Sequence, residues 1–177
     1  MVIVPRTNAK PTQPMIAPAS QVSAVTELLE EYARRGVFRG FSCQQARGGK
    51  ATYRLLWHRN QTFDVTFEPA SGRVGISRLL VNVPANSAMY RELKQFIASR
   101  QSDDLPEHRR VDRDKARVYV SNRKGVVSLA VESVDGNDPY GARKLIHLVH
   151  EIFMTFLVEG NYFDYMVEVF DLDPDRM

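Results

Sequence analysis

Short runs in which apolar and polar residues alternate, joined by tight turns, constrain the fold of this chain most. In residues 62–68 every second side chain is apolar, and residues 53–57 alternate in the same way. Alternation with a period of two is the pattern of a strand with one buried face. Only residues 58–61 separate the two runs, and so short a connection joins antiparallel neighbours. These residues therefore predict an antiparallel hairpin with one dry face.

The remaining patterns extend this hairpin into an α+β domain. A change of the apolar face near Arg78 indicates a bulge or a strand end. Strands joined by short turns, with helices between the blocks of strands, predict one antiparallel sheet covered by helices mainly on one face. We expect about six strands in the order α-ββββ-α-ββ-α-α. The predicted elements are a helix at 21–35 with Ser23 as its N-cap, four strands ending at 83, a helix at 87–100, a polar loop at 101–116, strands at 117–121 and 126–132, a helix at 139–158 and a short helix at 161–170.

The length of 177 residues fits a single domain, which we place at residues 21–177. Residues 1–20 contain four prolines and predict a flexible leader, and residues 171–177 an acidic tail. The sequence lacks an apolar run long enough for a signal peptide or a membrane span, so we expect a cytoplasmic protein with no membrane partner. The lone Cys43, expected on a half-buried strand, indicates a reducing compartment. No motif calls for a cofactor.

The long helix at 139–158 carries the one motif with a catalytic resemblance. Asp138 before Pro139 predicts its N-cap, and Gly160 its end. Within it, His147, His150 and Glu151 form the sequence HLVHE, whose order differs from that of zinc proteases and which lacks a third ligand. A metal-dependent hydrolase is therefore the least favoured alternative. We expect solvated histidines, no metal site and no catalytic residues, with His58 and His108 isolated from the others.

A basic stretch in and after the polar loop offers a nucleic-acid-binding alternative. Acidic residues alternate with its cations, a pattern typical of a solvated surface, so nucleic acid is the less favoured partner. Aromatic residues on nearby strands, such as Trp57 and Tyr119, are expected to pack in the sheet. The cations of this alternative site are Arg109, Arg110, Arg113, Lys115 and Arg117.

The short helix at 161–170 is aromatic on more than one face. Aromatic and methionine side chains are favoured at protein interfaces, yet such a helix also packs on a sheet, and the sequence leaves both interpretations open. The residues predicted to bind a protein are Tyr162, Phe163, Tyr165, Met166 and Phe170.

The order of elements from residue 24 to 158 resembles the type III secretion chaperone-like fold, which the putative bacterial sensory transduction regulators share. The similar part comprises the helix at 24–35, the strand meander, the helix at 87–100 and the helix at 139–158. The chain departs from this pattern by a fourth strand in the meander, a basic body and its aromatic extension. The resemblance implies a small non-enzymatic bacterial protein, chaperone-like or regulatory, that forms a homodimer and binds a protein segment along its sheet or helices.

Overall fold

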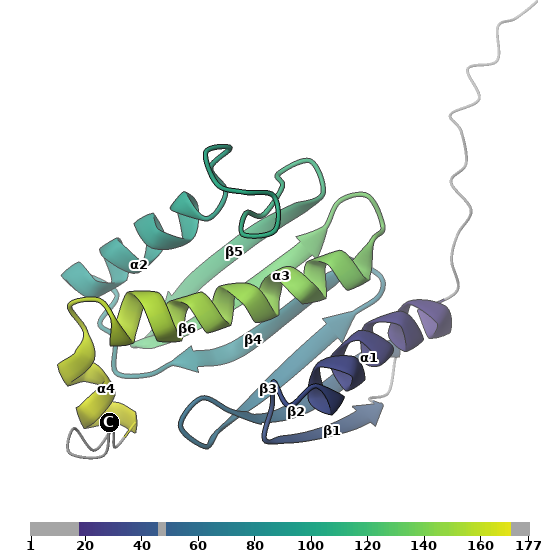
Figure 1. The fold of residues 1–177 in the computed structure, drawn as a ribbon, viewed down its shortest axis with the longest axis horizontal. Coiled ribbons are helices and arrows are strands. Elements are labelled where there is room, and N and C mark those ends of the chain that lie inside the picture. The colour runs from purple at the N-terminus through teal and green to yellow at the C-terminus, as the bar shows by residue number, and fades with distance from the viewer. Residues whose placement is uncertain (1–17, 46–48, 171–177) are drawn as a thin grey trace, which may run out of the picture.

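The computed structural model describes residues 18–45 and 49–170, and within them the chain forms one six-stranded antiparallel sheet with helices (Figure 1). The strand order is β1-β2-β3-β4-β6-β5, which confirms the predicted α+β fold. The elements are α1 (Pro18–Arg34), β1 (Gly40–Gln45), β2 (Ala51–Trp57), β3 (Gln61–Glu68), β4 (Arg73–Leu80), α2 (Ala88–Ser99), β5 (Ala116–Arg123), β6 (Val126–Ser133), α3 (Asp138–Glu151), the π-helix η2 (Ile152–Val158) and α4 (Phe163–Phe170).

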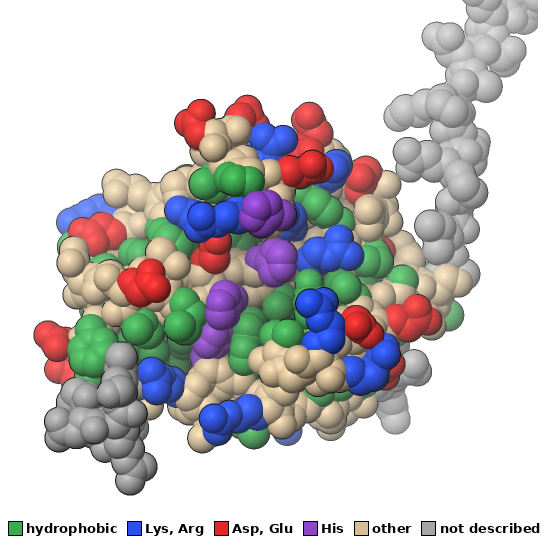
Figure 2. Space-filling model, in the orientation of Figure 1, with side chains coloured by type: hydrophobic (Ala, Val, Ile, Leu, Met, Phe, Trp, Pro, Cys, Tyr) green, Lys and Arg blue, Asp and Glu red, His purple; other side chains and the backbone are tan. Residues whose placement is uncertain are grey.

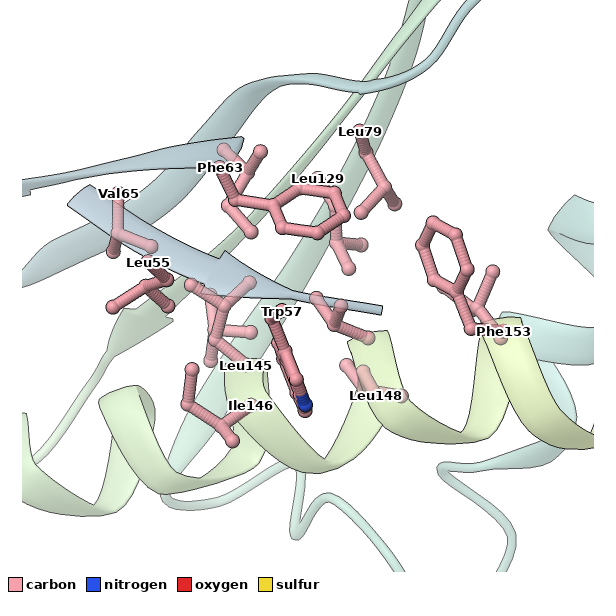
Figure 3. Close-up of a cluster of buried hydrophobic side chains, with 14 of the residues drawn as sticks. Leu55, Trp57, Phe63, Val65, Leu79, Leu129, Leu145, Ile146, Leu148 and Phe153 are labelled. Carbon is pink, nitrogen blue, oxygen red and sulfur yellow. The ribbon is translucent and has the colours of Figure 1, made fainter. Parts of the chain in front are cut away.

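The helices α1 and α3 lie side by side across one face of the sheet (Figure 1). The helix α3 presents Leu145, Leu148 and Val149 to the strands, and all three are buried. Trp57 from β2 and Phe63 from β3 fill the space between the strands and the helix (Figure 3). On β3 the side chains that alternate with this core are exposed, as period-two strands require. One face of the sheet is therefore dry, and none of the described helices covers the other, open face.

Tight turns hold the predicted hairpins. Trp57 pairs with Gln61 across the first turn, where Arg59 and Asn60 both have positive φ, at 55° and 59°. Such turns match the right-handed twist of paired strands. The predicted irregularity near Arg78 is confirmed, because the register of β4 against β6 shifts between Ile76 and Leu80.

The starts of α1 and α3 differ from the prediction. The helix α1 begins at Pro18, so residues 18–20 belong to the helix and not to a leader, and Ser23 lies inside the helix instead of capping it. Proline is favoured in the first turn, because the N–H that it lacks would have no partner within the helix there. Asn137, not Asp138, caps α3, accepting from the N–H of Tyr140 at 3.2 Å. The remaining leader, residues 1–17, and the tail, residues 171–177, lie outside the described residues.

The predicted long helix changes character at its middle. It is α-helical to Glu151 and then continues as the π-helix η2, where the N–H of Glu159 donates to the carbonyl of Met154 at 3.0 Å. The aromatic helix begins two residues later than predicted, at Phe163. Cys43 is exposed, not half-buried, because it lies on the edge strand β1. Among the described residues, no helix has the length and apolar character needed to cross a membrane.

Candidate functional site

The open face of the sheet carries a row of small side chains that crosses four strands. The strand register places Tyr119 of β5 beside Ala130 of β6, Ala130 beside Gly75 of β4, and Gly75 beside Thr66 of β3. A side chain at Gly75 would crowd its neighbours, since a Cβ there would lie 2.9 Å from the Cβ of Ala130. The row is therefore a shallow floor that ends at an aromatic ring.

A second row, parallel to the first, alternates in charge. It runs through Arg117, Glu132, Arg73, Glu68 and Lys50, of which neighbours on paired strands lie directly opposite each other. Lys50 and Glu68 form an ion pair of 2.5 Å. The hydrogen bond and charge of Lys50 lower the pKa of the Glu68 carboxyl. Opposite charges across strands stabilise the sheet, so this row has a structural role as well as a chemical one.

Arg73 is the member of the charged row with unused donor capacity. Its guanidinium lies over the ring of Tyr119, 4.3 Å from the ring centroid. Its Nε is buried and has no hydrogen-bond partner among the described residues. Tyr119 is 38% exposed, so the prediction that its ring packs in the sheet is wrong. The pair presents a flat cation over an aromatic ring on the open face.

The first row forms the floor of a groove of about 450 Å³ on the open face, and Glu68 and Arg73 of the charged row line one side of it. Its lining comes from β3, β4, β6 and β5. Three serine hydroxyls line the side of the floor opposite the charged row, and those of Ser121 and Ser128 lie 2.6 Å apart. We call this feature the sheet groove; its principal residues are Thr66, Glu68, Arg73, Gly75, Ser77, Tyr119, Ser121, Ser128 and Ala130.

The opposite, helical face presents the histidines in a line across α3 (Figure 2). The prediction that His58 is isolated is wrong, because its ring stacks on His150 at 5.6 Å between centroids and on Phe153 at 4.7 Å. Burial, with the charges of His150 and Arg59, lowers the pKa of His58 to about 4.

The carboxylate of the HLVHE motif is occupied by arginines. Glu151 accepts from Arg100 at 3.2 Å and pairs with Arg109 at 3.5 Å. Burial, followed by the charges of Lys144 and Arg143, lowers the pKa of His147. In the part of the chain that the structure describes, no three His, Cys, Asp or Glu residues gather in a metal-binding arrangement. Glu151 thus fastens the loop 101–115 to α3.

The predicted nucleic-acid-binding cations do not form one surface. Arg109 pairs with Glu151, Arg110 with Asp103 at 3.5 Å, and Lys115 with Glu107 and Asp112 at 3.7 and 3.8 Å. Arg113 is exposed in the loop, whereas Arg117 lies on the open face of the sheet. Acidic neighbours therefore offset most of the positive charge that this alternative requires.

The aromatic helix α4 divides its side chains between the core and the surface. Met166 and Phe170 are buried, at 1% and 9% exposure. The hydroxyl of Tyr165 donates to the carbonyl of Val81 at 2.5 Å, and burial raises the pKa of Tyr165 to about 12. The hydroxyl of Tyr162 donates to Glu92 of α2. Tyr162, Phe163 and Tyr165 keep partly exposed rings, and a protein-binding role for α4 stays a prediction.

Comparison of the chain with protein-family models, curated proteins and solved structures finds no match. The chemistry of the sheet groove is therefore derived from its own residues. Sequence reasoning did not select Arg73 or Tyr119 as site residues. The available signal was the outward face of residues 117–121, where an aromatic stands between a basic and a hydroxyl side chain. Only the register shows that Arg73 lies over this aromatic.

Proposed function

We propose that this chain is a non-enzymatic, cytoplasmic protein-binding module, chaperone-like or regulatory in kind, that receives a partner protein in the sheet groove. One observation supports the proposal above all others. The helices cover one face of the sheet, and the face that they leave open carries a groove beside an exposed tyrosine and an arginine whose Nε has no acceptor among the described residues. Tyrosine and arginine are the residues that most often dominate protein interfaces.

The shape of the groove favours a polypeptide over a small molecule. Small-molecule sites are deep and bury most of the ligand surface, whereas the sheet groove is shallow and open. It crosses four neighbouring strands, and three gaps of about 4.8 Å each give a length of about 14 Å. An extended chain advances roughly 3.3 Å per residue, so about four residues span that length. The expected occupant is a segment of a partner protein.

The test fills the floor of the groove without disturbing the core. Thr66 is exposed in the floor, and Thr62 is exposed on the same face of β3 outside the groove. We expect Thr66→Trp to abolish partner capture from the native lysate, and Thr62→Trp to leave it unchanged. A protein lost only with Thr66→Trp is then purified and titrated against the wild-type chain by calorimetry. Equal capture by both variants, or no binding in the titration, would refute the proposal.

The homodimer implied by the resemblance is a competing occupant of the same face. Sedimentation analysis of the wild-type chain and of Thr66→Trp separates the two cases. A wild-type dimer that becomes a monomer with Thr66→Trp would assign the groove to a second copy of this chain. Under our proposal the groove is free for another protein, so the mass of the wild-type chain and that of the variant agree.

A further inference from the structure

We infer that the segment received by the sheet groove carries a carboxylate side chain that binds Arg73. This inference rests on the proposed function and names the chemistry of the partner. It follows from the charges beside the groove, from the contact of the guanidinium with the Tyr119 ring and from the donors on the opposite side of the floor.

The charged row leaves Arg73 as the cation to be matched. Its neighbour Glu68 is already paired with Lys50. Its other neighbour, Glu132, lies between Arg73 and Arg117 and forms no ion pair within 4 Å among the described residues. The row contains three cations and two carboxylates, so one added carboxylate balances it. Arg73 itself forms no ion pair within 4 Å among the described residues, so a carboxylate of the partner can pair with its guanidinium.

The guanidinium is also held ready for a planar acceptor. Its central carbon lies over the Tyr119 ring, 4.3 Å from the centroid, and this cation–π contact restricts the side chain before a ligand binds. Arginine and a carboxylate form paired, charge-assisted hydrogen bonds in a common plane. A carboxylate side chain of the partner therefore finds both the charge and the geometry that it needs.

The rest of the groove suits the main chain of the same segment. Gly75 and Ala130 allow a backbone to approach the floor closely, because neither projects a long side chain. The hydroxyls of Ser77, Ser121 and Ser128 line the side of the floor opposite the charged row. Ser121 and Ser128 share one hydrogen bond, so Ser77 and one member of that pair can donate to peptide carbonyls. The groove thus combines one site for an acidic side chain with a general site for extended backbone.

The experiment selects 12-residue peptides from a random displayed library on the immobilised full-length chain. We expect the selected peptides to be enriched in Asp and Glu, and their binding to be blocked by Thr66→Trp. Arg73→Gln should weaken the best peptide about tenfold or more in a fluorescence polarisation titration, the scale of a lost charged hydrogen bond. Arg54→Gln is the matched control, since Arg54 pairs with Asp64 on the same face outside the groove. The affinity of the Arg54→Gln variant for the peptide should stay within about twofold of the wild-type affinity, as expected when only an exposed ion pair is lost.

The outcomes separate this inference from the function on which it rests. Peptides that Thr66→Trp blocks but that lack carboxylates and bind Arg73→Gln normally would overturn the inference and leave the protein-binding function standing. A selection that yields no peptides, or only peptides indifferent to Thr66→Trp, would overturn both. Circular dichroism of each variant verifies that the fold is unchanged. Arg73→Lys, which keeps the charge but not the planar fork, should recover only part of the affinity.

Discussion

At the scale of single residues, His58 is the side chain whose surroundings most change its chemistry. Its imidazole lies against Trp57 at 4.2 Å, Phe153 at 4.7 Å and His150 at 5.6 Å between ring centroids. Its Nε2 is buried without a hydrogen-bond partner in the described part of the chain. An aromatic environment with little water favours the neutral imidazole, so this corner of the core is built for an uncharged ring.

The lowered pKa of His58 predicts that the protein loses stability in mild acid. Histidine has an ordinary pKa near 6.5, and in the folded chain the pKa of His58 is about 4. The unfolded state therefore binds the proton first, and the stabilising effect of the neutral ring is present above pH 6.5 and lost as the pH falls toward 4. After allowance for partial exposure, we expect a loss of roughly 1–2 kcal/mol between pH 7 and pH 5.

Denaturant unfolding at the two pH values measures this loss, and His58→Phe is the control. Phenylalanine keeps a stacked ring but has no proton to bind, so the variant should lose less stability than the wild type over the same interval. An NMR titration of the wild-type imidazole gives the pKa directly. A His58 pKa near 6.5 in the folded protein would contradict the expectation.

Gly72 is a second residue that the fold requires. Its φ is 68°, and a Cβ there would lie 2.9 Å from the carboxylate of Asp138 and in contact with the hydroxyl of Ser133. Asp138 and Ser133 are both buried and hydrogen-bonded to each other, so neither has room to move. We expect Gly72→Ala to cost about 3 kcal/mol of unfolding free energy, from backbone strain and crowding together.

A matched substitution isolates the crowding. Gly136 has nearly the same backbone, with φ at 80°, but no atom within 4 Å of its missing Cβ. Gly136→Ala should therefore cost only about 1 kcal/mol, from backbone strain alone. Chemical denaturation of the two variants measures the difference, and equal costs would show that the contacts with Ser133 and Asp138 relax freely.

At the scale of elements, the loop 101–115 is fastened to α3 although it has no regular structure. The ammonium group of Lys144, 4% exposed, donates to the carbonyls of Glu107 and His108 at 3.2 Å each. The N–H of Asp112 donates to the hydroxyl of Tyr140 at 2.9 Å. Burial lowers the pKa of Lys144 below its usual range. Its side chain is buried, and its charged end holds the loop.

Replacing this lysine should free the loop and leave the sheet intact. In Lys144→Met the stem packs as before, but the two carbonyls lose their donor, so we expect faster hydrogen exchange at Val111 and Asp112. The rates in β4 and β6 should stay unchanged. Lys94→Met on the exposed side of α2 is the control. Equal exchange in both variants would show that Glu151 and its arginines hold the loop without Lys144.

The elements themselves were largely predictable from the sequence, apart from the π-helix and the exact starts of some helices. The alternation in residues 62–68 and the turn residues fixed strands and hairpins, because these patterns depend on neighbours in the chain. The π-helix and the start of α1 were not predicted. In the helix of residues 139–158, the apolar pattern continues through the change at Glu151. A helix that widens keeps its composition, so periodicity does not reveal it.

At the scale of the whole molecule, the strands and helices share one apolar core. The buried residues form one cluster that extends from Val22 in α1 to Phe170 in α4. Trp57, the single tryptophan of the chain, lies within it at 7% exposure. We expect the folded chain to unfold in one cooperative transition, with tryptophan fluorescence and far-ultraviolet circular dichroism changing at the same denaturant concentration. Separate midpoints would show that the α1 side and the α4 side unfold independently.

The candidate site depends on this larger scale, which explains why the sequence did not predict it. Arg73 and Tyr119 are 46 positions apart in the chain, and they meet because β6 pairs with both of their strands. Tyr119 alone looks like a packing residue of a strand. A shift of the strand pairing by one residue would turn Tyr119 toward the core. Only the observed pairing of Tyr119 with Ala130 excludes that shift.

The π-helix has one more consequence, which concerns the angular phase of the chain. Each residue of a π-helix turns the chain by less than the 100° of an α-helical residue, so rewinding all of η2 as α-helix would rotate everything beyond it about the helix axis. Phe170 would then leave its edge-to-face contact with Phe153, and Tyr165 its bond to Val81. The wider turns of η2 thus set the direction in which the C-terminal helix departs.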